Sequence, residues 1–324
     1  MLLIITNRHD LASDYLIHGL RGNNIPFVRF NTDQYPETVL IDIEFNKSGF
    51  SYNLTLGDQR INSSTVTSVY FRQPIAPTFR EDATEVERLF AETELLETMR
   101  SFWRVIPEEL WLNHPKRLWV AANKVEQLIA AQKIGFRIPD TLISCSPERI
   151  RDFFAKENGQ VVAKAVKHGF MRSGDEVLLA GTQILPDDFL SQLEYFAQVP
   201  MTFQEKVEID VDVRVVVVGD SVFPASIAAK QNPEVTDWRI SDIIGDEIAY
   251  DRINLPEEIK QNCLDITRHF HLNYSSIDLV KDQQGNFIFL ELNPNGQWGW
   301  IEQNLSYPIR DTIISKLLDI AKNK

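Results

Sequence analysis

Residues 276–300 read SIDLVKDQQGNFIFLELNPNGQWGW and contain the clearest structural pattern in the chain. Two apolar runs, Ile277–Lys281 and Phe287–Leu292, flank the polar segment Asp-Gln-Gln-Gly-Asn. Polar residues and glycine between two such runs are typical of a turn that joins paired strands. The stretch therefore predicts a β-hairpin with a four-residue loop at Gln283–Asn286.

The register of this hairpin predicts a cluster of oxygen ligands. Asp282 would pair with Phe287, which places Asp278 opposite Glu291 on the same face. Asn293 shares that face with Glu291, because strand side chains alternate with period two. Two carboxylates and an amide, with no His or Cys, suit Mg²⁺ held jointly with nucleotide phosphates. A polar hairpin tip on an ordinary antiparallel sheet is the alternative explanation.

Length and composition narrow the class of protein. The 324 residues, 44% hydrophobic and 24% charged, are enough for two or three packed subdomains. No run of about eighteen apolar residues occurs, so no membrane-spanning helix is expected. The start, MLLIITNRHD, lacks the basic region and cleavage site of a signal peptide.

Cysteine usage and charge narrow the compartment and the partners. Cys145 and Cys263 lie far apart in the sequence, which fits reduced thiols in a cytoplasmic protein. No CxxC or HExxH spacing occurs, so a structural zinc site is not expected. The formal net charge of −13 argues against nucleic acid as the main partner and is compatible with a basic peptide.

The first part of the chain, residues 1–108, predicts an α/β domain. A strand at Leu2–Thr6, an amphipathic helix at 10–21 and a strand at Ile25–Phe30 indicate a parallel unit. Further strands are expected at Val39–Phe45, Phe50–Leu56 and Val66–Arg72, and a long helix at 81–104. No glycine-rich fingerprint follows the first strand, so the sequence does not indicate a dinucleotide site.

After a linker at 107–117, the remainder is divided into units at 109–200 and 201–324. The unit at 109–200 is expected to contain three helices, at Leu118–Ile134, from Ser146 and at 187–197. Its expected strands are Thr141–Ser144, Val161–Val166 and Val177–Leu179, and a loop is expected at His168–Asp175. The second is expected to hold a strand at Thr202–Val207, a hairpin of Val215–Val218 with Val222–Ala228, helices at Pro256–Phe270 and 307–322, and the hairpin described above.

Several charged and aromatic residues each allow two interpretations. Lys164, inside Val-Val-Ala-Lys-Ala-Val, is either a solvated lysine on an edge strand or a cation aimed at phosphate, which the glycine-containing loop after it favours. Asp212 and Arg214 share a strand face, either as part of a site or only as a cross-strand ion pair worth well under about 1 kcal/mol. The tryptophans Trp298 and Trp300 either fill the core or line a substrate site.

In this order, these pieces resemble the ATP-grasp superfamily from about residue 110 to 305. They are a lysine on the first helix after the linker, VVAKAV, a Gln-Glu-x-Val hinge, an Asp-x-Arg strand and a late Asp…Glu-x-Asn set. The resemblance implies an α/β protein of the ATP-grasp fold, with α+β subdomains that hold ATP between them and an N-terminal α/β pre-ATP-grasp domain. The phosphate loop HGFMRSGD departs from the family pattern because it is not very glycine-rich.

The resemblance also implies a role for each matching residue. Lys124 and Lys164 would bind phosphates, and Asp212 would hold the ribose. The hinge is Gln204, Glu205, Lys206 and Val207, and the backbone of Glu205 and Val207 would face adenine. Asp278, Glu291 and Asn293 would ligate Mg²⁺, and Arg214, Lys230 and Arg239 would stabilise charge on an acyl phosphate.

Within the superfamily, ELNPNGQWGWIE looks like the macrocyclising peptide ligases, the graspetide or microviridin maturases. NHPKR, TDWR and an N-terminal part that reaches YFRQP at Tyr70–Pro74 are similar to that group as well. Such enzymes activate Glu or Asp side chains of a ribosomal precursor peptide as acyl phosphates, and Ser, Thr or Lys side chains of the same peptide then attack. The resemblance also implies a leader peptide bound away from the active site, and a homodimer.

Two other functions fit parts of the sequence. A ligase that adds a free amino acid such as glutamate to a peptide or protein end would have the same ATP site. A regulatory protein that binds nucleotide and has lost the reaction is the second alternative, and the intact Asp278, Glu291 and Asn293 set argues against it.

Overall fold

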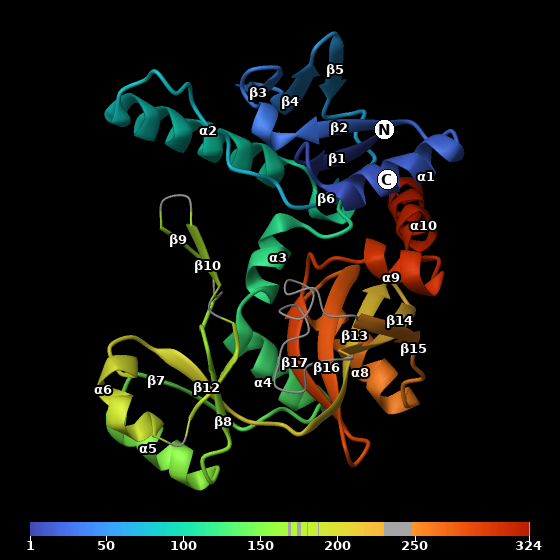
Figure 1. Ribbon diagram of the computed structural model, residues 1–324. Helices are drawn as coiled ribbons and strands as arrows, with labels where there is room; N and C mark the ends of the chain where they lie inside the picture. The colour runs from blue at the N-terminus through green and yellow to red at the C-terminus, as the bar shows by residue number, and fades with distance from the viewer. Residues whose placement is uncertain (168–169, 174–175, 180, 187, 230–247, 324) are drawn as a thin grey trace.

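The structure is a computed structural model that describes the chain except residues 168–169, 174–175, 180, 187, 230–247 and 324 (Figure 1). The chain begins with β1 (Leu2–Thr6), which is fully buried. It pairs in parallel with β2 (Phe27–Asn31) and β6 (Ser68–Phe71), in the order β2-β1-β6. Helix α1 (Leu11–Gly22) connects the first two strands, so the predicted parallel unit is confirmed.

The other N-terminal elements cover this sheet. Strands β3 (Val39–Asn46), β4 (Gly49–Leu56) and β5 (Gln59–Asn62) form an antiparallel meander, and a short 3₁₀ helix, η1, spans Thr32–Gln34. The long helix α2 (Glu85–Val105) starts four residues later than predicted, because Thr84 and Glu87 form a reciprocal cap there.

The predicted single helix at Leu118–Ile134 is wrong. A short 3₁₀ helix, η2 (Glu108–Leu110), leads into α3 (Pro115–Ala121), and a separate helix, α4, spans Lys124–Ile134. Asn123 separates the two helices because its side chain accepts hydrogen bonds from the backbone N–H groups of Val125 and Glu126. Lys124 is therefore the first residue of α4.

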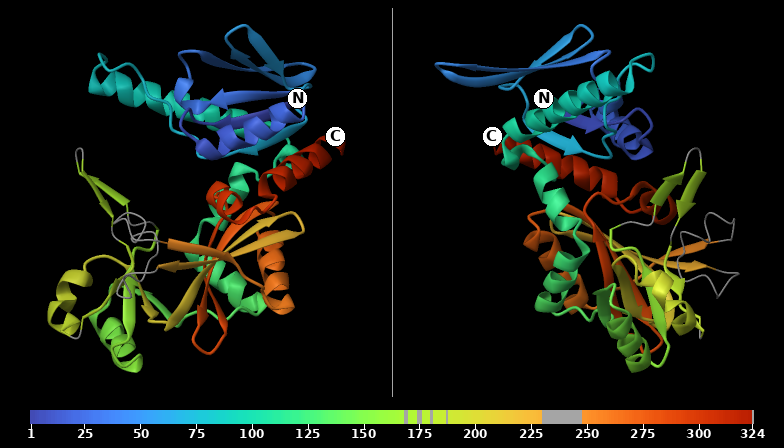
Figure 2. Two further views of the ribbon diagram at one scale, coloured as in Figure 1. Left: turned by 45° about the vertical axis from the view of Figure 1, so that its right-hand side comes forward. Right: turned by 90° about the vertical axis from the view of Figure 1, so that its left-hand side faces the viewer.

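The middle of the chain forms a four-stranded sheet in the order β11-β8-β12-β7. Its elements are β7 (Thr141–Ser144), α5 (Pro147–Lys156), β8 (Val161–Lys164), β11 (Gln183–Ile184), η3 (Phe189–Gln192), α6 (Leu193–Phe196) and β12 (Met201–Glu205). The expectation of a loop at 168–175 was wrong for its described part, because β9 (Phe170–Ser173) pairs with β10 (Glu176–Leu179). This hairpin projects away from the sheet (Figures 1 and 2).

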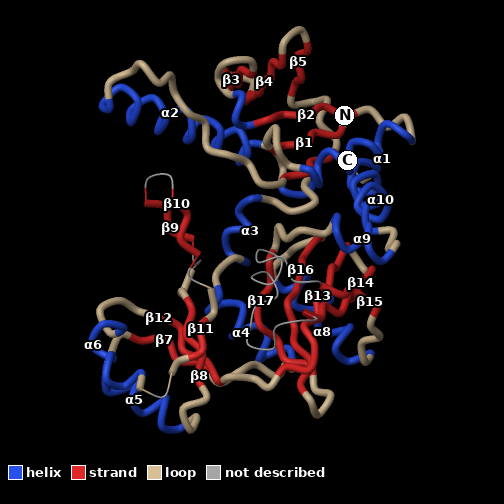
Figure 3. The backbone as a smooth tube through the Cα atoms, in the orientation of Figure 1, coloured by secondary structure: helices blue, strands red, loops and turns tan. Residues whose placement is uncertain are grey.

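A five-stranded antiparallel sheet follows, in the order β15-β14-β13-β16-β17. It is formed by β13 (Ile209–Val218), β14 (Ser221–Ala229), β15 (Ile248–Arg252), β16 (Tyr274–Asp282) and β17 (Phe287–Asn293). The helices of this region are α8 (Glu257–His269), α9 (Gly299–Leu305) and α10 (Ile309–Lys322), and α4 packs against α8 and β17 (Figure 3). No described helix is long and apolar enough to cross a membrane.

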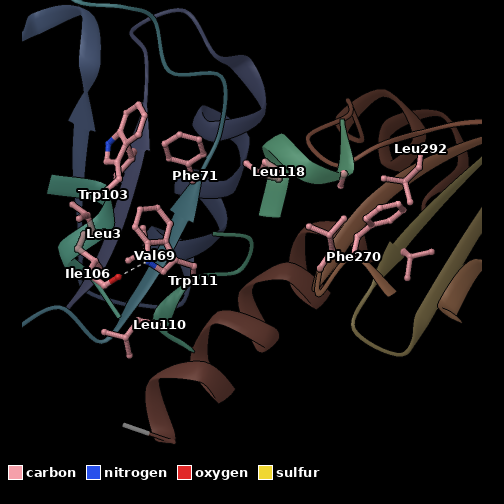
Figure 4. Close-up of a cluster of buried hydrophobic side chains, with 14 of the residues drawn as sticks. Leu3, Val69, Phe71, Trp103, Ile106, Leu110, Trp111, Leu118, Phe270 and Leu292 are labelled. Carbon is pink, nitrogen blue, oxygen red and sulfur yellow. Dashed lines mark hydrogen bonds between the residues drawn. The ribbon is translucent and has the colours of Figure 1, made fainter. Parts of the chain in front are cut away.

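The N-terminal sheet and the five-stranded sheet share their hydrophobic cores. One buried cluster joins Phe71 and Trp111 to Leu118, Phe270 and Leu292 (Figure 4). A second joins α1 to α10 and β13. The middle sheet packs on a cluster of its own, built on Phe154, Phe189 and Phe203 among others.

Candidate active site

The β16–β17 hairpin brings Asp278 opposite Glu291, as predicted, by a different path. Near the turn Lys281 pairs with Phe287, one residue away from the predicted partner Asp282. A bulge between Asp278 and Leu279 shifts the register back. Two deviations thus cancel at the position that matters for the site.

The side chain of Asp282 explains the shifted turn. Its Oδ1 accepts hydrogen bonds from the backbone N–H groups of Gln284 and Asn286, and its Oδ2 accepts one from Arg137. Hydrogen bonds from Asn286, followed by the nearby N–H groups and Arg137, lower the pKa of Asp282. The carboxylate is therefore held inside the turn.

Arg214 completes a row of charged residues across three strands, because β13 places it opposite Asp278. Its Nε lies 2.5 Å from Asp278 Oδ1, its Nη2 donates to Asp278 Oδ2 at 3.3 Å, and its Nη1 donates to Ser276 Oγ at 2.9 Å. Both charged side chains are nearly buried, and burial of a charge is costly without a partner. The guanidinium is thus fixed beside one predicted metal ligand.

Helix α4 brings a second cation to the row. Lys124 Nζ lies 3.4 Å from Glu291 Oε2, and both side chains are about one quarter exposed. The buried Gln127 fixes this approach, because its Oε1 accepts from Leu292 N–H at 2.8 Å and its Nε2 donates to Leu292 O at 2.7 Å. Strand β17 is the edge strand of its sheet, so no neighbouring strand is present on its outer side. Gln127 therefore provides the hydrogen-bond partners for the N–H and carbonyl of Leu292.

Asn293 ends β17 and opens a tight turn. Its Oδ1 accepts a hydrogen bond from Asn295 N–H at 3.0 Å. Gly296 packs so closely on β16 that an added Cβ would lie 2.5 Å from Ser276 Cβ. An amide oxygen has two lone pairs, so the bond from Asn295 leaves one for a metal.

The donor chemistry of this set fits Mg²⁺. Asp278, Glu291 and Asn293 supply carboxylate and amide oxygens at one end of the hairpin. In the described part of the chain, no three His, Cys, Asp or Glu side chains lie together as a metal cluster. The predicted set is not of that kind, because its third member is the amide of Asn293. A cation already accompanies each carboxylate: Arg214 lies beside Asp278, and Lys124 lies beside Glu291.

Lys164 and the first hinge residues, Gln204 and Glu205, lie on the middle sheet. Lys164 is half-buried at the end of β8, opposite Thr202 on β12. Gln204 is buried, and its Nε2 donates to Thr141 Oγ1 at 2.8 Å. The backbone N–H groups of Glu205 and Lys206 donate to the carbonyl oxygens of Asp140 and Gln160, respectively, at 2.9 Å.

Strand β13 follows this hinge and carries Asp212, which shares a face with Arg214. The structure therefore gathers Arg214, Lys124 and the three predicted metal ligands, with the hinge on the neighbouring sheet. Lys230 and Arg239 lie outside the described residues.

Of the two tryptophans, Trp298 belongs to the hydrophobic core. Its side chain is fully buried, packs on Tyr15 and donates from Nε1 to Tyr70 Oη at 3.4 Å. Trp300 is half-buried and packs on Tyr250. Trp298 is therefore core and does not line a site.

Sequence reasoning missed the residues that position the site. Gln127 was hidden among polar helix residues, although it lies three residues after Lys124 and so near the same helix face. Asn113 is buried, donates to Tyr274 O and Pro294 O, and accepts from Asn273 N–H and Tyr274 N–H. Its position in the quoted NHPKR motif was the available signal.

Comparisons with known proteins agree with this geometry. The family model described as MvdD pre-ATP grasp domain matches residues 1–118, and the model described as RimK-like ATP-grasp domain matches residues 121–317. Comparison with curated protein sequences gave no significant match.

Solved structures resemble the whole chain. The macrocyclase MdnC from Microcystis aeruginosa MRC, bound with precursor peptide MdnA, has a TM-score of 0.86 at 26% identity, covering 98% of this chain and 99% of that one. A RiPP-associated ATP-grasp ligase from Chryseobacterium gregarium, in complex with ADP and a leader and core peptide, has a TM-score of 0.89 at 26% identity, covering 98% and 96%. The ATP-grasp ligase PsnB, complexed with minimal precursor, Mg and ADP, shares the fold at 21% identity and a TM-score of 0.74, covering 98% and 97%. Because a family model matches residues 121–317, well over half of the sequence, this protein belongs to the RimK-like ATP-grasp family.

Proposed function

We propose that this protein is an ATP-dependent ligase that closes macrocycles within a ribosomal precursor peptide. The observation that carries the proposal is the likeness along 98% of the chain to a macrocyclase bound with its precursor peptide. The gathered Asp278, Glu291 and Asn293 support an active ligase over a regulatory protein without the reaction.

The reaction has two steps. The side-chain carboxylate of a Glu or Asp in the peptide attacks the γ-phosphorus of ATP, which forms an acyl phosphate and releases ADP. A Ser or Thr hydroxyl or a Lys amine of the same peptide then attacks the acyl carbon, loses its proton and expels phosphate. The product is an ω-ester or ω-amide ring, and the enzyme supplies no nucleophile of its own.

The chain's residues manage charge and position. Asp278, Glu291 and Asn293 would hold Mg²⁺, which when bound offsets the charge of the triphosphate. Arg214 lies beside this set and would stabilise charge on the acyl phosphate, together with Lys230 and Arg239. Lys124 and Lys164 would bind phosphates.

The hinge and Asp212 would hold the rest of the nucleotide. The Glu205 N–H already donates to the Asp140 carbonyl, so adenine would meet the Glu205 carbonyl and the backbone of Val207. Asp212 would accept hydrogen bonds from the ribose.

The partner would be a precursor peptide with a leader and a core, and the active protein would be a cytoplasmic homodimer. A ligase that adds free glutamate is less favoured, because the similar structures include a macrocyclase bound with its precursor peptide and a ligase in complex with a leader and core peptide.

The mass of the peptide tests the proposal. The protein is incubated with ATP, Mg²⁺ and precursors rich in Thr or Ser and Glu or Asp, encoded beside its gene, and intact masses are read. Successive losses of one water, with resistance to fragmentation between the joined residues, are expected, because both groups are already on one chain. If the peptide gains the mass of an amino-acid residue, or if only free glutamate stimulates ADP release, the protein is instead a ligase that adds free amino acids.

A further inference from the structure

The side chain of Arg72 links the N-terminal domain to the turn that follows Asn293. Arg72 comes directly after β6 and is 1% exposed. Its Nη1 donates to the backbone carbonyls of Asn295 and Gly296, at 3.2 and 2.9 Å. Both acceptors lie more than 220 positions away in the sequence, on the loop that leaves β17.

The base of this contact is rigid. Arg72 Nε donates to Asp10 Oδ1 at 3.2 Å, and the Asp10 side chain is also 1% exposed. Asp10 caps α1, because its Oδ2 accepts from Ser13 N–H and Ser13 Oγ, and Thr6 Oγ1 donates to the same oxygen. The guanidinium is therefore fixed against the ends of β1 and β6.

Stability alone is a weak explanation for this pair. Two buried charges lose their hydration, and apolar residues of similar volume often stabilise a fold as well or better. Arg72 also interacts with the buried hydroxyl of Tyr70. The ion pair with Asp10 is therefore weak evidence for a role in stability alone.

The turn that Arg72 holds leads directly to a predicted metal ligand. Tyr274 Oη also donates to the Gly296 carbonyl, at 2.7 Å, and burial raises the pKa of Tyr274, so the hydroxyl stays a donor. On the other side Gly296 is pressed against Ser276. The Asn295 N–H, which lies between the two held carbonyls and Asn293, orients Asn293 Oδ1.

We propose that Arg72 is a positioning residue for the metal site: it holds the 295–296 turn so that the Asn293 amide oxygen points at the metal. The inference rests on the proposed role of Asn293 as a ligand. The N-terminal domain, which supplies no predicted ligand, thereby contributes to metal affinity. Partners that orient metal ligands commonly affect affinity by about 10- to 100-fold.

The test measures metal binding directly. Free Mn²⁺ is followed by electron paramagnetic resonance in the presence of ADP, for the parent and for Arg72→Lys, Tyr15→Phe and Glu291→Ala. Lysine keeps the charge but has a single nitrogen, so it cannot replace both Nε, which donates to Asp10, and Nη1, which donates to the two carbonyls. Tyr15→Phe is the matched control, because Tyr15 Oη donates across the same domain boundary to Glu302, away from the turn.

Arg72→Lys is expected to weaken Mn²⁺ binding by about tenfold, to leave ADP affinity without metal unchanged, and to raise the Mg²⁺ concentration needed for ADP release. Tyr15→Phe should match the parent in metal binding. If Arg72→Lys binds Mn²⁺ like the parent while Glu291→Ala does not, the inference is wrong and the metal site stands. Normal binding by Glu291→Ala would overturn the site assignment itself. If Arg72→Lys fails to fold, Tyr274→Phe decides, since it removes the other donor to Gly296 and must weaken Mn²⁺ binding.

Discussion

Glu291 is the residue whose loss should be most damaging to the reaction. Glu291→Ala removes a carboxylate beside Asp278 and leaves Lys124 without this partner, so turnover should fall at least ~100-fold. Unfolding temperature should change little, because an ion pair that is one quarter exposed contributes modestly to stability. ADP release with precursor peptide measures the effect.

The matched control for this prediction is Asp220→Asn, which changes an exposed ion pair between the β13–β14 turn and Arg268 on α8. It should leave ADP release at the parent value. Near-normal turnover of Glu291→Ala would contradict the metal assignment.

At this scale the sequence predicted the opposition of Asp278 and Glu291 but not the partners that hold them. Strand periodicity places residues on a face, and that information is local. The bonds from Gln127 to Leu292 and from Asn113 to Tyr274 join segments more than 160 residues apart, so no local pattern contains them.

Among the helices, α3 has an N-terminal cap that titrates. His114 Nδ1 accepts a hydrogen bond from Lys116 N–H, and burial is the main cause that lowers the pKa of His114. The folded chain thus binds this proton more weakly than the unfolded chain. The contribution of His114 to stability is present above about pH 6.5, the ordinary histidine pKa, and is lost as the pH falls through the folded value.

The variant His114→Asn should remove this pH dependence, because asparagine keeps a capping oxygen and does not titrate. Thermal unfolding between pH 7.5 and about pH 5 should show a steeper loss of stability in the parent than in the variant. Equal slopes in the parent and His114→Asn would contradict the role of the cap.

Some helices and strands could be predicted from local sequence patterns, and others could not. The β1–α1–β2 unit and the β13–β14 hairpin, with its Gly219-Asp220 turn, follow the predictions because their signals are continuous in sequence. The division between α3 and α4 was missed because apolar residues continue across Asn123, whose capping bonds break the helix. The pairing of β9 with β10 was missed because glycines and charges suggested a loop.

On the scale of the whole molecule, the described chain contains two kinds of core. The N-terminal and five-stranded sheets share buried clusters, as Phe71 and Leu292 illustrate in Figure 4. The middle sheet has a small separate core around Phe203. Units with few shared buried contacts open at lower free energy than the rest of a protein.

Amide hydrogen exchange should therefore be faster in the middle sheet than in the sheets that share a core. Without nucleotide, amides of β8 and β12 should exchange faster than those of β1 and β16, because the middle sheet can open without disrupting the shared core. ADP with Mg²⁺ should slow exchange in β8 and β12 most, since the predicted phosphate lysine Lys164 and the hinge belong to that sheet and a ligand stabilises the state that binds it. Lys164→Met keeps the aliphatic stem without the charge, so it should lose most of this protection while its exchange without nucleotide matches the parent. Equal protection of the sheets that contain β1, β8 and β16, or equal protection in Lys164→Met, would show that nucleotide binding does not depend on the middle sheet in this way.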